Sequence, residues 1–223
     1  MRNYNFLQLT TTLKTLYFLI LSEWKNKHAV ITVFLFIFIA TLITLLGMPS
    51  MDASLYSSMF WIVMIFTTLQ GIAKSYLQMS KGHFLFWHQM LTPNQFLGSK
   101  LLFNVLLMVV YTLFTFVIFN VIHGVLIEQI FHFLLSSFLT GIGISSIITI
   151  NSSIAAKTDN AGLLLPIMTF PSIVPILLIG IKVSKKAVDG LSTIVQLDYL
   201  ILLLINILIV VLGMILVKYI WKD

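Results

Sequence analysis

Six apolar runs, each long enough to cross a lipid bilayer, constrain this chain more than any other feature of its sequence. One span needs about 20 mostly apolar residues, and in lipid a helix satisfies its own backbone hydrogen bonds. The sequence therefore predicts an all-α polytopic membrane protein with about six transmembrane helices. The predicted spans cover residues 28–46, 55–73, 97–122, 131–154, 162–181 and 199–217.

The composition argues against a soluble fold. Of the 223 residues, 59% are hydrophobic and 9% are charged, whereas a soluble domain carries about 25% charged residues. A fold with so few charged side chains has no means of covering its surface in water, and lipid as the solvent removes that difficulty. The loops between the runs are short, so we expect a single transmembrane domain over residues 1–223.

The positive charges predict the orientation of the chain. With the N-terminus inside, ten of the 13 Lys and Arg residues fall on the inner side, and the other three lie between positions 182 and 186 on the outer side. Since basic residues favour the cytoplasmic side, both termini are predicted to be cytoplasmic. The basic residues form no patch, so the net charge of +6 predicts no nucleic-acid partner.

The segment before the first span is predicted to lie on the membrane surface. Over residues 5–27, apolar side chains recur at steps of three and four, which is typical of an amphipathic helix. A Trp at its end suits the interface with membrane lipid. The alternative is a frayed start to the first span. The apolar residues are Phe6, Leu9, Leu13, Leu16, Tyr17, Ile20 and Trp24.

Two connections between spans stand out. The inner connection, residues 74–97, is the longest polar stretch and contains a short helix candidate from Phe84 to Leu91, between Gly82 and Pro93. On the outer side, residues 183–197 combine apolar and charged side chains in an amphipathic pattern.

The sequence carries no motif for covalent chemistry. It has no Gly-rich phosphate-binding loop, no His-Glu-x-x-His motif and no Cys, which excludes thiolate metal sites and Cys nucleophiles. The seven acidic residues fall in predicted loops or at span ends, whereas ion-coupled transporters place ionisable groups at membrane depth. We therefore expect no catalytic residue, no metal site and no cofactor bound by this chain, and an energy source in another subunit.

Two histidines leave alternatives open. His123 and His132 are predicted near the outer face, where a pair of histidines can ligate haem iron. They fall on different predicted elements, and nothing in the sequence determines the distance between them. The favoured alternative is that each ring reaches water or forms hydrogen bonds within the protein.

Glycines and prolines mark the fourth and fifth spans. Gly141 and Gly143 allow helices to approach closely in lipid. In the fifth span, Pro166, Pro171 and Pro175 remove backbone hydrogen bonds and are expected to interrupt the helix with a kink. Because carbonyls freed at membrane depth must face protein or a wet cavity, the prolines predict either a hinge or cavity lining, or a static kink packed against its neighbours.

Two stretches resemble a known transporter family. Residues 162–179, Gly-Leu-Leu-Leu-Pro-Ile-Met-Thr-Phe-Pro-Ser-Ile-Val-Pro-Ile-Leu-Leu-Ile, are similar to the Leu-Pro and Pro-x-x-x-Pro-Leu-Leu signature of the CcmB family. That family, also called haem exporter protein B, is the permease subunit of the cytochrome c maturation ABC transporter. Residues 81–104 resemble the family's Gly…Leu…Pro…Ala/Ser-Lys segment, and the length and number of spans agree over nearly the whole chain.

The resemblance implies an ABC-2-type permease in the bacterial cytoplasmic (inner) membrane. Family members form homodimers and pair with two copies of a cytosolic ABC ATPase, a haem-handling membrane protein, a small membrane subunit and a haem chaperone, and haem would be a cargo of that complex. Residues 183–197 would be periplasmic, and the prolines of the fifth span would act as a hinge. The ATPase would bind the coupling loop, residues 74–97, through Gly82, Phe84, Phe86, Trp87, Leu91 and Pro93.

Three functions remain open, and in none of them is the chain an enzyme. The first is a permease subunit that couples ATP hydrolysis by its partner to haem delivery or to release of the haem-loaded chaperone. The second is a generic ABC-2-type exporter of lipid, drug or polysaccharide. The third is a membrane scaffold that assembles haem-handling partners without transporting anything.

Overall fold

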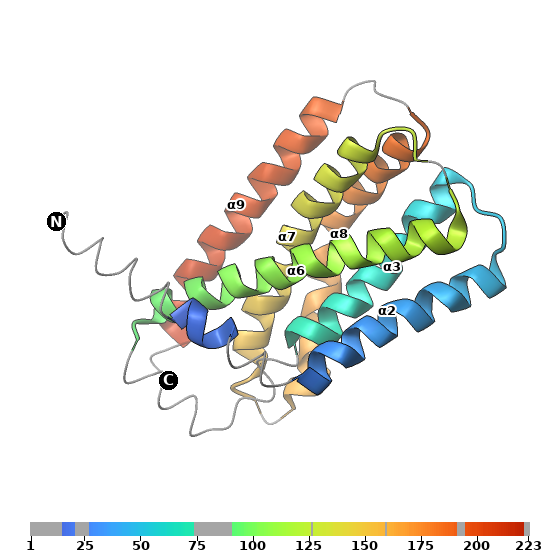
Figure 1. The fold of residues 1–223 in the computed structure, drawn as a ribbon. Helices are drawn as coiled ribbons and strands as arrows, with labels where there is room; N and C mark the ends of the chain where they lie inside the picture. Colours follow the sequence, from blue (N-terminus) through green and yellow to red (C-terminus); the bar gives the residue numbers. More distant parts are fainter. Residues whose placement is uncertain are drawn as a thin grey trace.

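The structure, a computed structural model, describes residues 15–20, 27–73, 91–125, 127–158, 160–190 and 195–220. These residues form long helices and, within those ranges, no strand (Figure 1). The helices are α2 (Lys27–Gly47), α3 (Ala53–Thr68) with the π-helix η1 (Leu69–Ala73), α6 (Pro93–His123), α7 (Ile130–Ala155), α8 (Ala161–Val188) and α9 (Val195–Ile220).

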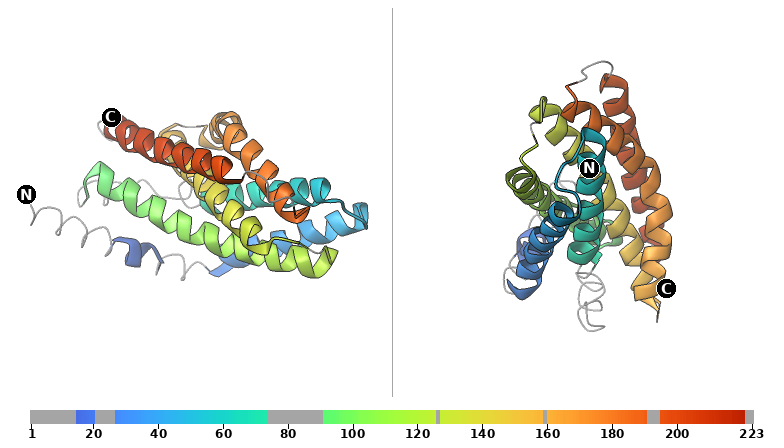
Figure 2. Two further views of the ribbon diagram at one scale, coloured as in Figure 1. Left: turned by 90° about the horizontal axis from the view of Figure 1, so that it is seen from above. Right: turned by 90° about the vertical axis from the view of Figure 1, so that its right-hand side faces the viewer.

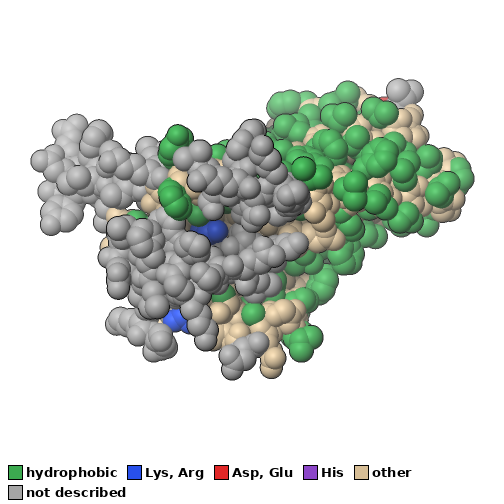
Figure 3. Space-filling view, turned by 60° about the horizontal axis from the view of Figure 1, so that its bottom comes forward, with side chains coloured by type: hydrophobic (Ala, Val, Ile, Leu, Met, Phe, Trp, Pro, Cys, Tyr) green, Lys and Arg blue, Asp and Glu red, His purple; other side chains and the backbone are tan. Residues whose placement is uncertain are grey.

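The prediction of an all-α polytopic membrane protein is confirmed. In the described ranges, six helices are long and apolar enough to cross a membrane, with spans of 18 to 31 residues. Hydrophobic side chains cover much of the described surface on the side drawn in Figure 3. In lipid this apolar exterior is the solvated surface.

The predicted spans match these helices, and most of the helices extend beyond them. The structure places Val183 to Val188, the first part of the expected outer segment, in the last turns of α8, and residues 195–197 in the first turn of α9. Residues 191–194 lie outside the described ranges. Of the predicted surface helix, the structure describes residues 15–20, which are helical, with Tyr17, Phe18 and Ile20 exposed.

The helix α7 lies at the centre of the bundle. It packs against α3, α6, α8 and α9, whereas α2 and α9 lie at opposite edges (Figures 1 and 2). In its most apolar stretch, 72% of the α7 residues are buried, against 17% in α2 and 22% in α9. The central helix is therefore the one whose side chains decide how the others pack.

The two ends of the bundle can be named by the predicted orientation. At the inner end lie the starts of α2, α6 and α8 and the ends of η1, α7 and α9, as Figure 1 shows. The outer end holds the opposite termini. Because six crossings return the chain to its starting side, α2 begins and α9 ends on the same face.

An aromatic cluster holds α3, α6 and α7 together. Tyr56 and Phe60 of α3 meet Phe119 of α6 and Phe133 of α7, with ring centroids 5.1 to 5.9 Å apart. All four side chains are fully buried. Most of these pairs are edge-to-face, a geometry worth about 0.5–1.5 kcal/mol per pair beyond area burial.

Small residues let the backbones approach, as expected for Gly141 and Gly143. A Cβ on Gly180 of α8 would lie 2.6 Å from the Oγ1 atom of Thr140 on α7, and one on Gly141 would lie 2.9 Å from Cε of Met108. At Gly143, the Ile176 side chain already fills the place of a Cβ. Glycine is thus required at these contacts because the neighbouring helix occupies the space.

We predict that Gly180→Ala destabilises the protein by about 1–3 kcal/mol, because overpacking of a tight contact forces the helices apart. Thr140 approaches the new methyl group with its Cβ as well as its hydroxyl, so a rotamer change does not relieve the overlap. The measurement is the unfolding free energy in mixed micelles.

Gly162→Ala, in the first turn of the same helix, is the matched control. An added Cβ there meets no described atom within 4 Å, so we expect unchanged or slightly higher stability. Equal effects of the two substitutions would contradict the packing argument.

Candidate functional site

Most of the predicted coupling residues lie outside the described ranges: these are Gly82, Phe84, Phe86 and Trp87. The structure does describe the point where the chain re-enters the bundle. Leu91 is half-buried, and Pro93 is the first residue of α6. The backbone N–H of Thr92 donates to Oε1 of Gln95 (3.0 Å), and Pro in the first turn needs no N–H partner. The Thr92–Gln95 hydrogen bond and the proline therefore fix the residue at which α6 begins.

The other end of the coupling loop is held by η1. Within this π-helix Ile72 is fully buried, and a Cβ on Gly71 would lie 2.7 Å from the ring of Tyr111 on α6. Short π-helical segments are frequent at functional sites. Residues 74–90 thus connect two elements that are both packed tightly into the bundle.

The three prolines lie inside one continuous helix. α8 is one helix from Ala161 to Val188 with all three prolines inside it, so the prolines do not divide the fifth span into two helices. Pro171 and Pro175 are exposed, and Pro166 is half-buried. The buried face of α8 is formed by other residues, among them Thr169 and Ile173. The two exposed prolines therefore line no interior space within this chain.

A row of polar side chains runs along α7 through the membrane-spanning region, and we call it the polar seam. The Asn104 amide of α6 donates to Oγ1 of Thr149 (2.7 Å), and that of Asn151 donates to Oγ1 of Thr169 on α8 (3.3 Å). Asn206 of α9 donates to the carbonyl of Leu139 (2.9 Å). These three asparagines and both threonines are at most 8% exposed. Each helix that flanks α7 along this row is thus joined to it by an amide.

Asn104 interrupts the apolar run of the third predicted span. Asn151 and Asn206 interrupt apolar runs in the same way, and that interruption is the signal that sequence reasoning missed. A lone amide in a transmembrane helix costs free energy unless it finds a partner, so it indicates a contact with another helix.

The seam holds helices together and does not titrate. Its members are amides and hydroxyls, which neither take up nor release a proton near neutral pH. The described carboxylates lie at helix ends or in connections: Asp52, Glu128, Asp189 and Asp198. This part of the chain therefore offers no carboxylate at mid-membrane depth for ion coupling.

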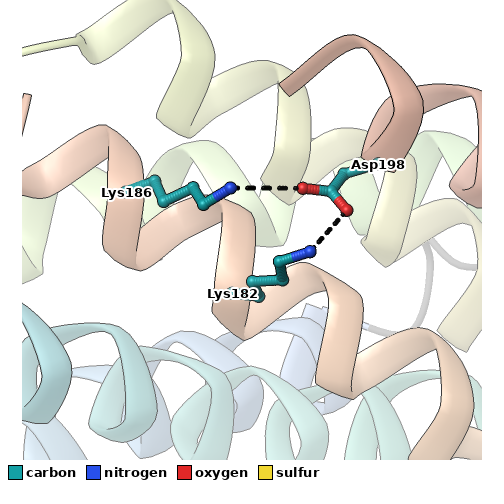
Figure 4. A network of polar contacts seen from close by, with 3 residues as sticks. All are labelled: Lys182, Lys186 and Asp198. Carbon is teal, nitrogen blue, oxygen red and sulfur yellow. Dashed lines mark hydrogen bonds and ion pairs between the residues drawn. The ribbon is translucent and has the colours of Figure 1, made fainter. Parts of the chain in front are cut away.

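At the outer end, α8 and α9 are joined by an ion-pair network (Figure 4). Asp198 accepts from Nζ of Lys182 at 2.8 Å and lies 3.6 Å from Nζ of Lys186. The Asp198 side chain is 8% exposed, so the two lysines compensate a nearly buried charge. Two of the three outer basic residues, Lys182 and Lys186, therefore form ion pairs within the chain.

The end of α8 is also bonded to the connection between α6 and α7. The Gln129 backbone N–H donates to the Ala187 carbonyl (3.0 Å), and its side-chain amide donates to the Gly190 carbonyl (3.1 Å). Gly190 has a φ of 73°, the left-handed conformation that suits glycine after a helix. These bonds satisfy carbonyls that the helix itself cannot use.

Both outer histidines are hydrogen-bonded within the protein. Nε2 of His123 lies 3.0 Å from Oγ1 of Thr44 on α2. The Tyr199 hydroxyl donates to the His132 carbonyl (3.2 Å) and lies 3.1 Å from Nδ1 of the same residue. Each ring is engaged by a different helix, which favours a structural role over paired haem ligation.

The fold and the seam together define an all-α polytopic membrane protein with no described metal cluster of three or more His, Cys, Asp or Glu residues. Comparison with protein-family models, with characterised proteins and with solved structures finds no significant match for this chain. The functional argument therefore depends on the chain's own residues.

The seam makes a quantitative prediction. Asn104→Leu should lower the free energy of unfolding by about 0.6–2 kcal/mol, the range for a hydrogen bond between membrane helices. In a double-mutant cycle with Thr149→Val, the two effects should be non-additive, because either substitution removes the same bond. The measurement is unfolding in mixed micelles.

The control cycle pairs Asn206→Leu with the same Thr149→Val. These two residues share no described hydrogen bond, so their effects should add to within about 0.5 kcal/mol. Additive effects in the Asn104 cycle would show that the bond contributes nothing to stability.

Proposed function

We propose that this chain is the permease subunit of an ATP-driven complex for cytochrome c biogenesis, similar to the CcmB family. One observation carries the proposal. The predicted coupling loop, residues 74–97, follows η1 and includes the start of α6 at Pro93, and both elements are packed into the bundle through Ile72, Gly71 and the first turns of α6. In this proposal, a force applied to the loop is passed to α3 and α6, the helices at its two ends.

The contacts of α3 supply a path from the inner to the outer end. Trp61, fully buried on α3, donates from Nε1 to Oγ of Ser184 on α8 (3.0 Å). The aromatic cluster joins the same stretch of α3 to α6 and α7. A displacement of α3 is thus passed to the outer end of α8, where the ion pairs with Asp198 connect it to α9.

In this proposal the energy source is external. Two copies of a cytosolic ABC ATPase bind the inner ends of a homodimer of this chain, and the chain itself neither hydrolyses ATP nor binds a cofactor. A haem-handling membrane protein, a small membrane subunit and a haem chaperone complete the complex, with haem as its cargo. The rings of His123 and His132 are hydrogen-bonded within the fold and so are less suited to bind haem. This supports the version of the proposal in which ATP hydrolysis releases a haem-loaded chaperone.

The coupling loop provides the direct test. Phe86→Asp should abolish copurification of the ATPase in mild detergent. The reason is that a charge at this position of the coupling loop would have to be desolvated in the proposed contact with the ATPase. The chain itself should remain at its normal level in the membrane. Mass spectrometry of the pull-down identifies the ATPase and any cytochrome c maturation proteins.

Phe131→Asp is the matched control, since Phe131 is 72% exposed at the outer end of α7. It introduces the same charge on the opposite face and should leave the ATPase bound. Retention of the ATPase by Phe86→Asp would refute the assigned contact. Recovery of an ATPase without haem proteins would instead support a generic exporter.

The orientation is tested by single cysteines, because the natural chain has none. Lys157 lies between α7 and α8 at the inner end, and Asp189 follows α8 at the outer end, and both are exposed. In spheroplasts, a membrane-impermeant maleimide should label Asp189→Cys at once and Lys157→Cys only after permeabilisation. The reverse pattern would place the N-terminus outside.

A further inference from the structure

The exposed side of α8 differs from that of its neighbours. On α6 between residues 102 and 121, and on α9 between residues 200 and 216, the exposed residues are all Leu, Ile or Val. On α8, a stripe of exposed residues at steps of four and three includes Pro171, Pro175 and Leu178, and the exposed Ser172 borders it. Besides apolar side chains such as Phe170 and Val174, the middle of this helix therefore exposes two prolines and a hydroxyl, which the exposed sides of α6 and α9 lack in these stretches.

The prolines leave backbone acceptors without their usual donors. Proline has no N–H, so Pro171 cannot donate to the carbonyl of Ile167, and Pro175 cannot donate to that of Pro171. Ile167 is itself 68% exposed. Lipid offers no hydrogen-bond donor, and freed carbonyls at membrane depth need a protein partner or a wet cavity. A face of this kind is poorly suited to contact with acyl chains alone.

The same stripe also carries a donor. The Ser172 hydroxyl donates back to the Met168 carbonyl (2.8 Å), an acceptor that the helix already uses. Ser172 is adjacent in sequence to Pro171, whose carbonyl is one of the freed acceptors. Donor and acceptor thus lie at the same depth on one exposed side, which makes this side complementary to itself.

We propose that a second copy of this chain packs against this side of α8, with each Ser172 hydroxyl donating to the freed Pro171 carbonyl of the other copy. A two-fold axis along the membrane normal places equal residues of two parallel helices at equal depth, so both bonds form together. Compact Pro and Ser side chains also allow the close backbone approach that membrane helices need. The inference rests on the proposed pairing of two copies and is independent of the ATPase.

Oxidative cross-linking in membranes tests the surface, again because the chain has no natural cysteine. The variants are Leu178→Cys on the stripe and Leu204→Cys on α9, which are 63% and 54% exposed. Leu178 lies ten residues before the end of α8 and Leu204 nine residues after the start of α9, so the two positions have similar depth. The chain is expressed without the ATPase, so that a failure of coupling leaves this result unaffected.

We expect a cross-linked species of twice the chain mass for Leu178→Cys and none for Leu204→Cys. Three results would overturn the proposal: no cross-link at Leu178, equal cross-linking at both positions, or a cross-link from Leu178 to a different protein. Monodisperse elution of both variants in mild detergent shows that they are folded.

The hydrogen bond is tested within the Leu178→Cys background. Ser172→Ala should reduce the cross-linked fraction about threefold to tenfold, as expected for loss of hydrogen bonds between membrane helices. Pro175→Ala returns an N–H donor to the Pro171 carbonyl, so in that background Ser172→Ala should have little further effect. An unchanged fraction in Ser172→Ala would refute this bond.

Discussion

The packing of this protein depends on how its helices attract one another in a solvent that provides neither hydrogen bonds nor a hydrophobic drive between them. Two kinds of contact remain, close backbone approach and hydrogen bonds, and α7 supplies both. Its glycines accommodate Met108 and Ile176 from neighbouring helices, and its polar residues bond to amides or hydroxyls on α6 and α8. Because each of these contacts involves α7, the positions of α6, α8 and α9 all follow from this one helix.

The contacts at mid-membrane differ in kind from the contacts toward the ends of the bundle. At mid-membrane, amide–hydroxyl bonds keep the helices in register without a group that titrates. Toward the ends, the connections are polar: α8 and α9 meet at Asp198, and α3 reaches α8 through Trp61. A mechanical subunit needs this combination, since a displacement at one end is passed on only if the helices between the ends stay packed. The second copy is proposed to pack on a side of α8 that is exposed in this chain.

Much of the fold follows from hydropathy, because the thickness of the bilayer sets the length of each apolar run. The six spans and the need for small residues in the fourth span are of this kind. The outer segment 183–197 is different. Its residues 183–188 form the last turns of α8, which are bonded to Gln129 and to Asp198, and the amphipathic pattern does not specify these partners. The prolines of the fifth span also do not interrupt α8, since a helix tolerates proline at membrane depth when its remaining backbone bonds persist.

The sequence by itself determined that the chain crosses the membrane as helices, how many times, and with which side chains available for contact. Only the tertiary structure decided which of those side chains meet. Trp61 and Ser184 are 123 residues apart, and nothing in an apolar run specifies the rotation or depth at which one helix faces another. The same holds for the exposed side of α8: the sequence shows that its prolines free backbone carbonyls, but only the packing shows that Pro171 and Pro175 lie on the exposed side of the helix. The physical reason is that hydropathy is a property of single residues, whereas helix pairing depends on shape and hydrogen-bond geometry between residues distant in the chain.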